Sequence, residues 1–360
     1  MFFAIIIVLI SLVSLATLHE LGHFLLAKKF GVRVDEFGIG YPPRIISKKI
    51  GETIYSLNLL PFGAFVRLPG ESKRLDDPES FSEQPVWQRI LIALGGVFSF
   101  WIIAIVIFSV VFSLGSTVAI DDTINSSDLI DPKVQIVDIS IDSPAEEAGL
   151  RIGDSIEKMS INNVNISPLK IGEVQDFVGN YLGEKITLTL NRGEETLEIS
   201  LTPRVSPPEG EGSLGVALTR TAIQKYSWYI APWQGFLTAG RLTIAITNGY
   251  AMAIKNIFLG APSGVEMVGP VGVFNALAQT QQLGATYFLN FLALICLYLA
   301  VFNLLPIPAL DGGKVVFLTI EAIRKKPVSE KIEERITLAS FALLLLMMAW
   351  VTVKDVISLF

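Results

Sequence analysis

Two histidines and a glutamate stand close together near the start of the chain, in the segment Thr17-Leu18-His19-Glu20-Leu21-Gly22-His23. The segment is an H-E-x-x-H motif. Residues four apart share one face of a helix, so His19 and His23 can direct imidazole nitrogens at one metal ion. From the adjacent position, the Glu20 carboxylate can reach a metal-bound water without binding the metal itself. The spacing predicts zinc-dependent peptide hydrolysis, with His19 and His23 as Zn2+ ligands and Glu20 as the catalytic base.

The alternative is a pair of helix histidines that are satisfied by their neighbours. These are the only two histidines in the chain, and the motif lies inside an otherwise apolar run from Phe2 to Ala27. Ionisable groups in apolar surroundings are costly unless they are paired or carry a function. The setting therefore favours a metal site.

The composition is that of an integral membrane protein, which interacts with a lipid bilayer. Hydrophobic residues make up 51% of the chain and charged residues 17%, with a mean hydropathy of +0.55, well outside the usage of soluble proteins. The net charge of −6, without a basic patch, argues against a nucleic-acid partner. The single cysteine, Cys296, cannot form an internal disulfide.

The first membrane helix is expected within residues 1–30. Its apolar run exceeds the roughly 20 residues that cross a bilayer. A signal peptide is the competing interpretation, but no positive region precedes the run and Lys28-Lys29 follow it. The lysines place this end on the cytoplasmic side, so the N-terminus is expected outside the cytoplasm. The motif then lies within the membrane, towards the cytoplasmic side.

Residues 31–88 read as a cytoplasmic loop that carries a membrane-associated β-hairpin. Residues 53–60 and 64–68 have strand patterns around Pro61-Phe62-Gly63. So small a sheet needs packing against the membrane domain, and its open edge could accept an extended peptide. A purely structural hairpin is the alternative. Candidate substrate contacts on the first strand are Tyr55, Leu57 and Leu59.

The second membrane helix is expected within residues 89–116, because Ile90 to Gly115 carries no charge. The small residues Gly95, Gly96 and Ser99 allow another helix to approach closely. Since the first helix ends in the cytoplasm, this one runs from inside to outside.

Residues 121–220 change to a soluble composition, with alternating strands at 134–139 and 185–190. Residues 142–156 between them resemble a PDZ domain, a module that binds peptides by adding a strand to a sheet edge. Leu214 and Gly215 resemble part of the carboxylate-binding strand of a circularly permuted version. The resemblance implies an extracytoplasmic PDZ-like domain that binds peptide termini.

Residues 226–286 read as an interfacial helix and a linker. Arg241, Asn248 and Lys255 interrupt its apolar residues, while Trp228 and Trp233 suit a headgroup layer. If this segment crossed the membrane, the next helix would end on the face opposite the two histidines. An interfacial position on the outer side avoids that conflict.

The third membrane helix, within residues 287–313, runs from outside to inside and ends at a helix-breaking stretch that contains Pro306 and Pro308. Irregular backbone at membrane depth is tolerated only where protein or a cavity satisfies it. A cytoplasmic loop at 314–335 and a fourth membrane helix at 336–360 complete the chain. The ends of the first and third helices thus meet at similar depth.

Catalytic zinc takes three protein ligands and keeps a position open for water. With no third histidine, the remaining ligand must be a carboxylate or Cys296. Cys296 lies about four helical turns from Asp311, at a rise of about 1.5 Å per residue, and therefore too far towards the outer leaflet. Asp311 has the matching depth. Its alternative role is that of a cap or turn residue before Gly312-Gly313.

The chain resembles the site-2 protease family of intramembrane zinc metalloproteases, close to the bacterial regulators of the envelope stress response. The resemblance rests on HELGH, the stretch from Asn303 to Gly313, the hairpin, a single PDZ-like domain and Gly269-Pro270-Val271-Gly272. It implies that Asp311 is the third ligand and that Asn303 holds the substrate or the oxyanion, with Pro306 in the same stretch as a further substrate contact. It also implies that the hairpin clamps the unwound substrate and that the PDZ domain restricts access.

Two features depart from the family pattern. Relatives often carry G-P-x-x-N-F where this chain has Gly95-Gly96-Val97-Phe98-Ser99-Phe100, and many carry two PDZ domains where this chain has room for one. A substrate contact from the second helix and the family's size filter are therefore not carried over.

The expected fold is a multi-span α-helical membrane protein with four transmembrane helices, a cytoplasmic-side β-hairpin and an extracytoplasmic PDZ-like α+β domain. The expected function is hydrolysis of peptide bonds within the transmembrane segments of single-span membrane protein substrates. One alternative is a silent membrane adaptor, which has no need for intact ligands and an intact glutamate. The other is a metalloprotease with its site outside the bilayer, which the apolar setting of HELGH disfavours.

Overall fold

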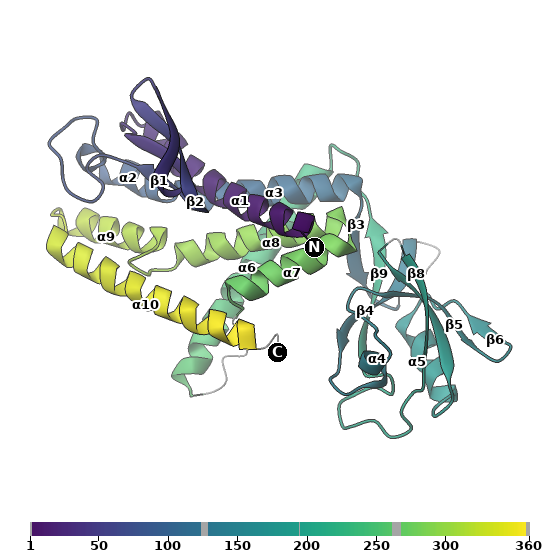
Figure 1. The fold of residues 1–360 in the computed structure, drawn as a ribbon. Coiled ribbons are helices and arrows are strands. Elements are labelled where there is room, and N and C mark those ends of the chain that lie inside the picture. The colour runs from purple at the N-terminus through teal and green to yellow at the C-terminus, as the bar shows by residue number, and fades with distance from the viewer. Residues whose placement is uncertain (1, 124–128, 194, 261–267, 358–360) are drawn as a thin grey trace. The chain divides into compact units, whose positions relative to one another are not determined.

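The computed structural model describes residues 2–123, 129–193, 195–260 and 268–357 (Figure 1). The chain divides into two units. The first, called here the helical unit, comprises Met1–Ser109, Pro232–Gln279 and Asn290–Phe360, and the second, the β-domain, comprises Val110–Ala231 and Thr280–Leu289.

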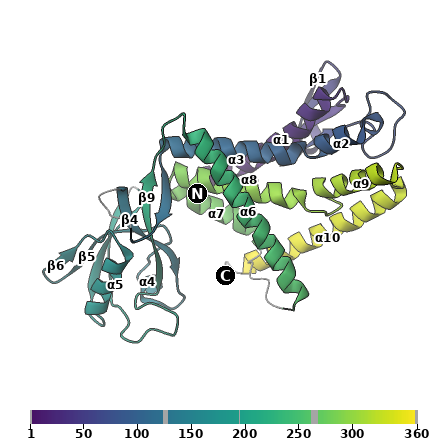
Figure 2. The same ribbon diagram turned by 180° about the vertical axis from the view of Figure 1, so that it is seen from behind.

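Four of the described helices are long and apolar enough to cross a membrane. They are α1 (Phe2–Lys29), α3 (Gly95–Leu114), α8 (Ala285–Leu304) and α10 (Glu330–Ile357) (Figure 2). Large apolar side chains such as Ile102 and Leu346 are exposed on them, as expected for surfaces that face lipid rather than water. The four predicted membrane helices are confirmed.

Helices α1 and α3 touch through glycines. A Cβ atom on Gly95 would lie 2.6 Å from the Gly22 carbonyl oxygen, and a Cβ atom on Gly22 would collide with the Gly95 carbonyl. Small residues allow this backbone contact, and membrane helices use it in place of hydrophobic side chains. The predicted close approach at Gly95 is confirmed, and it lies beside the H-E-x-x-H motif.

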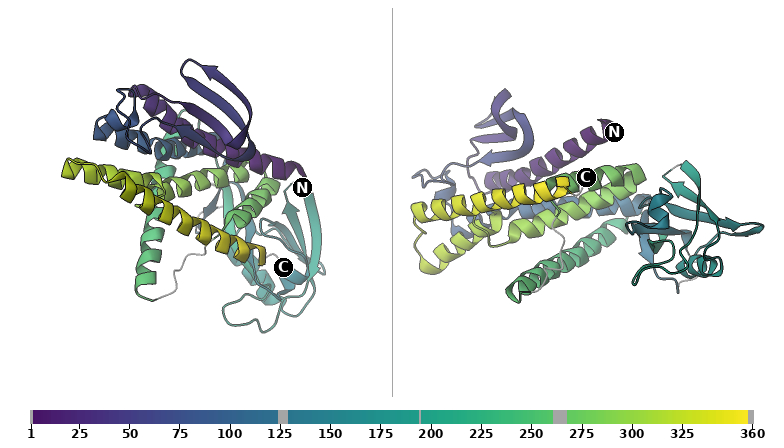
Figure 3. Two further views of the ribbon diagram at one scale, coloured as in Figure 1. Left: turned by 60° about the vertical axis from the view of Figure 1, so that its left-hand side comes forward. Right: turned by 60° about the horizontal axis from the view of Figure 1, so that its bottom comes forward.

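A cluster of buried residues packs beneath the end of α1. Ala27 and Val32 meet Phe81 of the short 3-10 helix η1 (Phe81–Glu83), Ile92 of α2 (Val86–Ala93) and Leu318 of α9 (Asp311–Arg324). Helix α9 was expected to be part of a loop at 314–335. The local sequence did not lead to the prediction of α9, whose apolar face is buried against these segments from distant parts of the chain. Helix α10 then runs back from the end of α9 (Figure 3).

The sheet of the helical unit is formed by two long bent strands, β1 (Glu36–Ile50) and β2 (Thr53–Arg67). Their paired segments follow the order 44–50, 53–58, 36–39 and 64–67. The expected pairing of 53–60 with 64–68 is therefore wrong, because both belong to β2 and residues 36–39 lie between them. Gly38 permits this arrangement, since a Cβ atom there would lie 2.5 Å from the Phe65 ring.

A buried carboxylate holds the centre of this sheet together. Glu36 is 1% exposed, accepts hydrogen bonds from Arg44 and from Ser56 (2.7 Å), and lies 3.3 Å from a guanidinium nitrogen of Arg67. Burial opposes ionisation of Glu36, but the hydrogen bonds and the two arginine charges outweigh it and lower the pKa of the carboxyl below its ordinary value.

Replacement of Glu36 by Gln is expected to reduce the free energy of unfolding at pH 7 by about 1.5 kcal/mol, since hydrogen bonds to charged groups contribute roughly 1.5–3 kcal/mol and the exposed arginines are screened. Because the folded-state pKa is lowered, the stabilisation is present above the unfolded-state pKa and is lost as the pH falls through the folded-state value. Melting curves of the wild type and the variant should therefore differ at pH 7 and converge on acidification. A constant difference would contradict the role of the Glu36 charge.

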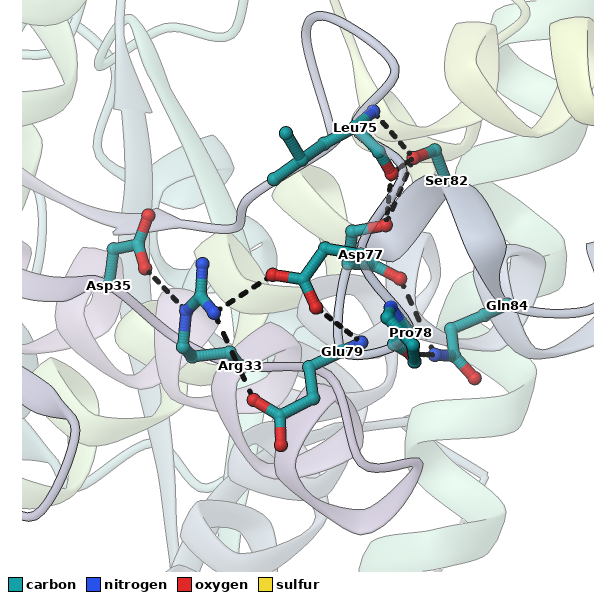
Figure 4. Close-up of polar contacts among 9 residues, drawn as sticks. Arg33, Asp35, Leu75, Asp77, Pro78, Glu79, Ser82 and Gln84 are labelled. Carbon is teal, nitrogen blue, oxygen red and sulfur yellow. Dashed lines mark hydrogen bonds and ion pairs between the residues drawn. The ribbon is translucent and has the colours of Figure 1, made fainter.

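The loop from Leu68 to Pro85 is fixed by polar contacts (Figure 4). Arg33 donates to Asp35 and to Asp77, at 3.1 and 3.0 Å. Farther along the loop, the Leu75 carbonyl oxygen accepts a hydrogen bond from Ser82, at 3.1 Å. The segment that follows the sheet therefore has a defined conformation on the surface of the helical unit.

The β-domain contains a sheet of strands in the order β3-β9-β4-β5-β7-β8, with β6 paired to β5. The strands are β3 (Ser116–Ile120), β4 (Ile130–Ile139), β5 (Ser155–Ile161), β6 (Val164–Ile166), β7 (Ile186–Arg192), β8 (Glu195–Leu201) and β9 (Val216–Gln224). The short helix α4 (Pro144–Glu147) is capped by Ser143, as its sequence predicts, and α5 (Ile171–Asn180) adds Phe177 to the core.

The expected interfacial helix is α6 (Ala231–Phe258), which packs on α3 through Gly235. The predicted linker contains a further helix, α7 (Pro270–Leu283), which the prediction missed. Asp355 of α10 accepts hydrogen bonds from the backbone of Gly269 and Gly272 at the start of α7, at 3.2 and 2.7 Å. This cap comes from a distant part of the chain, so the local sequence could not indicate it.

Candidate metal centre

Three side chains from the two ends of the chain converge in the helical unit. His19 Nε2 lies 3.3 Å from His23 Nε2, and Asp311 Oδ2 lies 3.5 Å from His19 Nε2 and 3.7 Å from His23 Nε2. The histidines lie on one face of α1, as their spacing predicts. Asp311 is the first residue of α9.

The irregular stretch after α8 brings Asp311 to this place. Helix α8 ends at Leu304, and α9 begins at Asp311. A Cβ atom on Gly312 would collide with the Leu304 and Leu305 carbonyls, and one on Gly313 would collide with the backbone of Ile307 and Pro308. Only glycines allow the start of α9 to pack this tightly, so the two glycines after Asp311 fix the position of its carboxylate.

The orientation of His23 is set by a backbone group. The Ile92 carbonyl lies 2.8 Å from His23 Nδ1, so this nitrogen carries the proton and donates it to the carbonyl. The His23 Nε2 lone pair is then free to bind a metal. On the other histidine, the His19 ring stacks on Phe100 with centroids 4.6 Å apart. Both imidazoles are thus held in defined orientations.

The donor set fits zinc. Four ligands about 2.0–2.2 Å from a tetrahedral zinc ion lie about 3.3–3.6 Å from one another. Two of the three separations in the structure, 3.3 and 3.5 Å, fall in this range, and the third, 3.7 Å, is slightly longer. Asp311 Oδ2 is buried and has no hydrogen-bond partner among the described residues, and such an atom is costly unless it binds a cation. Two imidazole nitrogens and one carboxylate oxygen also leave the fourth position for water, as in catalytic zinc sites.

Glu20 lies close to both histidines. One of its carboxylate oxygens is within 4.8 Å of a nitrogen of each histidine. The backbone of Val66 lies close to the Glu20 carboxylate. Val66 lies in the segment 64–67, which pairs with β1 on one side and forms an edge of the described sheet on the other. A carboxylate between a metal site and a sheet edge can exchange protons with a substrate held there.

Among the described residues, the predicted substrate-binding side chains make no recorded contact with His19, His23 or Asp311. Asn303 donates its side-chain amide to the Leu299 carbonyl of its own helix, at 2.9 Å, and Pro306 lies in the irregular stretch. Tyr55, Leu57 and Leu59 are partly exposed on β2, but segment 53–58 is paired on both sides and is not the free edge.

In the β-domain, Leu214 is buried and Gly215 has a φ of +73°. The Leu214 carbonyl accepts a hydrogen bond from the Ala145 N–H. Both residues immediately precede β9 and belong to the segment that was predicted to be a carboxylate-binding strand. The chain places them there, and their ligand remains a prediction.

Sequence reasoning missed three groups at the metal centre. Two are backbone groups, the Ile92 carbonyl and the Val66 N–H. The third is Gly96, where a Cβ atom would lie 2.5 Å from His19 Nδ1 and from His23 Nε2. The backbone groups carry no signal in residue type. The small residue at 96 was noticed, but its contact with the imidazoles was not.

Apolar membrane helices around an H-E-x-x-H motif and a distant carboxylate define the class of membrane-embedded metallopeptidases. Comparison with known proteins agrees, since the model of peptidase family M50 matches residues 5–347. The chain therefore belongs to peptidase family M50, the site-2 proteases, and is a zinc metalloprotease. The predicted family and its zinc dependence are confirmed.

The relatives extend over the whole chain. A protein of Clostridium perfringens, named as a candidate zinc metalloprotease, is 34% identical over 357 residues, covering 98% of each chain. The regulator of sigma-W protease RasP of Bacillus subtilis is 27% identical and covers 96% of each chain. The zinc metalloprotease RasP of Shouchella clausii is 29% identical, over 96% of this chain and 97% of its own.

Proposed function

We propose that this protein hydrolyses peptide bonds within the transmembrane segments of single-span membrane proteins, with His19, His23 and Asp311 as the zinc ligands. The observation that carries the proposal is the convergence of these three side chains inside a unit of apolar helices. A regulatory substrate, such as an anti-sigma factor, is suggested by the name of the sigma-W protease relative. Signal-peptide remnants have the same single-span chemistry.

The bound zinc supplies a Lewis acid that polarises the scissile carbonyl and lowers the pKa of water to about 7. Glu20 takes a proton from the attacking water and returns it to the leaving amine nitrogen. The partly buried setting of Glu20 keeps bulk water from competing for these protons. Asn303 is proposed to hold the substrate or the oxyanion, with Pro306 beside it.

The substrate strand is proposed to add to the edge at 64–67. A helix hides its peptide bonds, so a transmembrane substrate must unwind before cleavage, and its freed N–H and C=O groups then need partners. An edge strand provides such partners. Of the sheet segments, 64–67 is the one whose backbone reaches Glu20. This edge replaces the strand that contains Tyr55, Leu57 and Leu59 as the direct substrate partner.

The orientation in the membrane and the role of the β-domain are also proposals. We infer that the N-terminus lies outside the cytoplasm, that the metal centre lies towards the cytoplasmic side of the cell membrane and that the sheet of the helical unit associates with the bilayer. The exposed Ile45, Ile46 and Ile50 favour that association. The β-domain is proposed to be an extracytoplasmic PDZ-like module that binds peptide termini near Leu214 and Gly215.

The test is cleavage of a model single-span substrate by the detergent-purified protein, with the products mapped by mass spectrometry and zinc content measured on the same preparation. Cleavage inside the span, abolished by a chelator and restored by Zn2+, is the expected result. Products cut only outside the span would contradict the proposal and support a site that acts outside the bilayer. An inactive protein without zinc would favour the adaptor alternative.

Replacement of Val66 by Pro is expected to reduce kcat/KM about tenfold. Proline removes the Val66 N–H, which lies close to the Glu20 carboxylate, and one hydrogen bond contributes about 0.5–1.5 kcal/mol, more when it involves a charged group. The measurement is steady-state cleavage of the same substrate. Val66→Thr keeps the N–H and the strand propensity, so it should cleave like the wild type. Equal activity of the proline variant would show that cleavage does not need the Val66 N–H.

A further inference from the structure

The proposed reaction requires two segments that are distant in sequence to keep a fixed distance and orientation relative to each other. The substrate edge at 64–67 determines where the peptide lies, whereas Asp311 on α9 determines where the metal lies. These segments belong to opposite ends of the chain. A contact that joins them directly would control which peptide bond reaches the metal.

Such a contact joins Glu71 and Lys314, which are 243 residues apart in sequence. Lys314 Nζ donates to Glu71 Oε1 at 2.6 Å. The same ammonium lies 4.6 Å from the centroid of the Phe81 ring, a cation–π distance. Phe81 is 3% exposed, so the ammonium rests on a fixed aromatic surface.

Glu71 is rigidly connected to the substrate edge. It is the fourth residue after Arg67, the last residue of β2. Gly70 between them has a φ of +78°, and a Cβ atom there would lie 2.7 Å from Ser82 Oγ. The Pro69 carbonyl also accepts a hydrogen bond from the Phe81 N–H, at 2.8 Å. The backbone between Arg67 and Glu71 is therefore fixed against residues 81–82, directly after the edge strand ends.

Lys314 is connected just as closely to the metal ligand. It lies three residues after Asp311, in the first turn of α9, and its N–H donates to the Leu310 carbonyl at 3.2 Å. The tight packing of Gly312 and Gly313 fixes that turn. Arg89 also binds α9, through Glu321, but that residue lies nearly three turns beyond Asp311.

We propose that the Glu71–Lys314 ion pair positions the substrate edge relative to Asp311 and so determines the register of the scissile bond at the metal. Both are positioning residues, because they act through the edge strand and the ligand helix. The proposal rests on the proposed function. Loss of the pair leaves the hydrogen-bonding groups of the edge intact, so the substrate is still captured. Its scissile bond is then misplaced, and a displacement of about 1 Å can reduce the rate on the order of 10²-fold.

The test compares Glu71→Gln, Lys314→Met and the double variant in full-length protein, with kcat, KM and zinc content measured separately. Each single variant is expected to lose about tenfold or more in kcat, with KM within about twofold of the wild type and zinc content unchanged. The double variant should be no slower than the slower single variant, because both changes remove one interaction. Lys314→Arg preserves the pair and should restore kcat to within about threefold of the wild type.

Matched controls come from the same loop, where Lys73→Met and Asp76→Asn remove equal charges without touching the pair. Both should cleave like the wild type. The inference is overturned by wild-type kcat in the single variants, by a loss in KM alone, by loss of zinc or by multiplicative effects in the double variant. Failure of the proposed function would appear in the wild type itself, as absence of cleavage inside the span.

Discussion

Glu20→Gln is expected to retain zinc and to lose cleavage by a factor on the order of 10²–10⁴, the usual contribution of a general acid–base group. The substitution keeps the size of the side chain and removes its ability to carry a proton. The proposed zinc ligands His19, His23 and Asp311 are unchanged in this variant. Cleavage rate and zinc content of the purified protein are the two measurements.

The control is Glu147→Gln, which removes an exposed carboxylate from α4 of the β-domain. It should retain full activity, because it lies in another unit of the chain. If Glu20→Gln kept more than about a tenth of the wild-type rate, proton transfer would have to be assigned to another group. Loss of zinc in that variant would instead indicate that Glu20 is itself a ligand.

Gly96→Ala is expected to abolish both zinc binding and cleavage. The added Cβ atom would lie 2.5 Å from His19 Nδ1 and from His23 Nε2, so at least one imidazole must leave its place. Withdrawal of the α3 backbone would break its packing contact between Gly95 and Gly22. Since even changes behind the ligands commonly reduce metal affinity 10–100-fold, this direct collision should reduce zinc content to a small fraction. Metal analysis after gel filtration measures it.

Gly240→Ala is the matched control, since Gly240 lies within α6 and an added Cβ atom there meets nothing within 4 Å. Alanine should stabilise that helix by up to about 1 kcal/mol through its higher helix propensity. Normal zinc content in Gly96→Ala would mean that the helices separate more readily than the glycine contact indicates.

The metal centre could be predicted because each step used a strong local signal. The four-residue spacing of His19 and His23 gives the shared helix face, and the length of the apolar runs gives the depth at which α8 ends. Asp311 follows from these two facts and from the number of zinc ligands. The same reasoning recovered the contact at Gly95, because small residues on an uncharged helix have few other uses.

The sheet was harder to predict, because its centre violates local rules. Residues 36–50 contain a buried glutamate, two adjacent prolines and two lysines, so they do not alternate as a strand pattern does. Glu36 is accommodated only because Arg44, Ser56 and Arg67 surround it in the folded chain. Helix α7 was missed for a similar reason, since its cap is Asp355 on the last helix.

The backbone contact between Gly22 and Gly95 also limits how a peptide can approach the histidines. Two helices that touch through glycines have no side chains at the junction that could rotate aside. Separating them would require movement of whole helices and would lose the close backbone packing between them. A peptide is therefore expected to approach the histidines from another side of α1, such as the flank where Val66 lies close to Glu20.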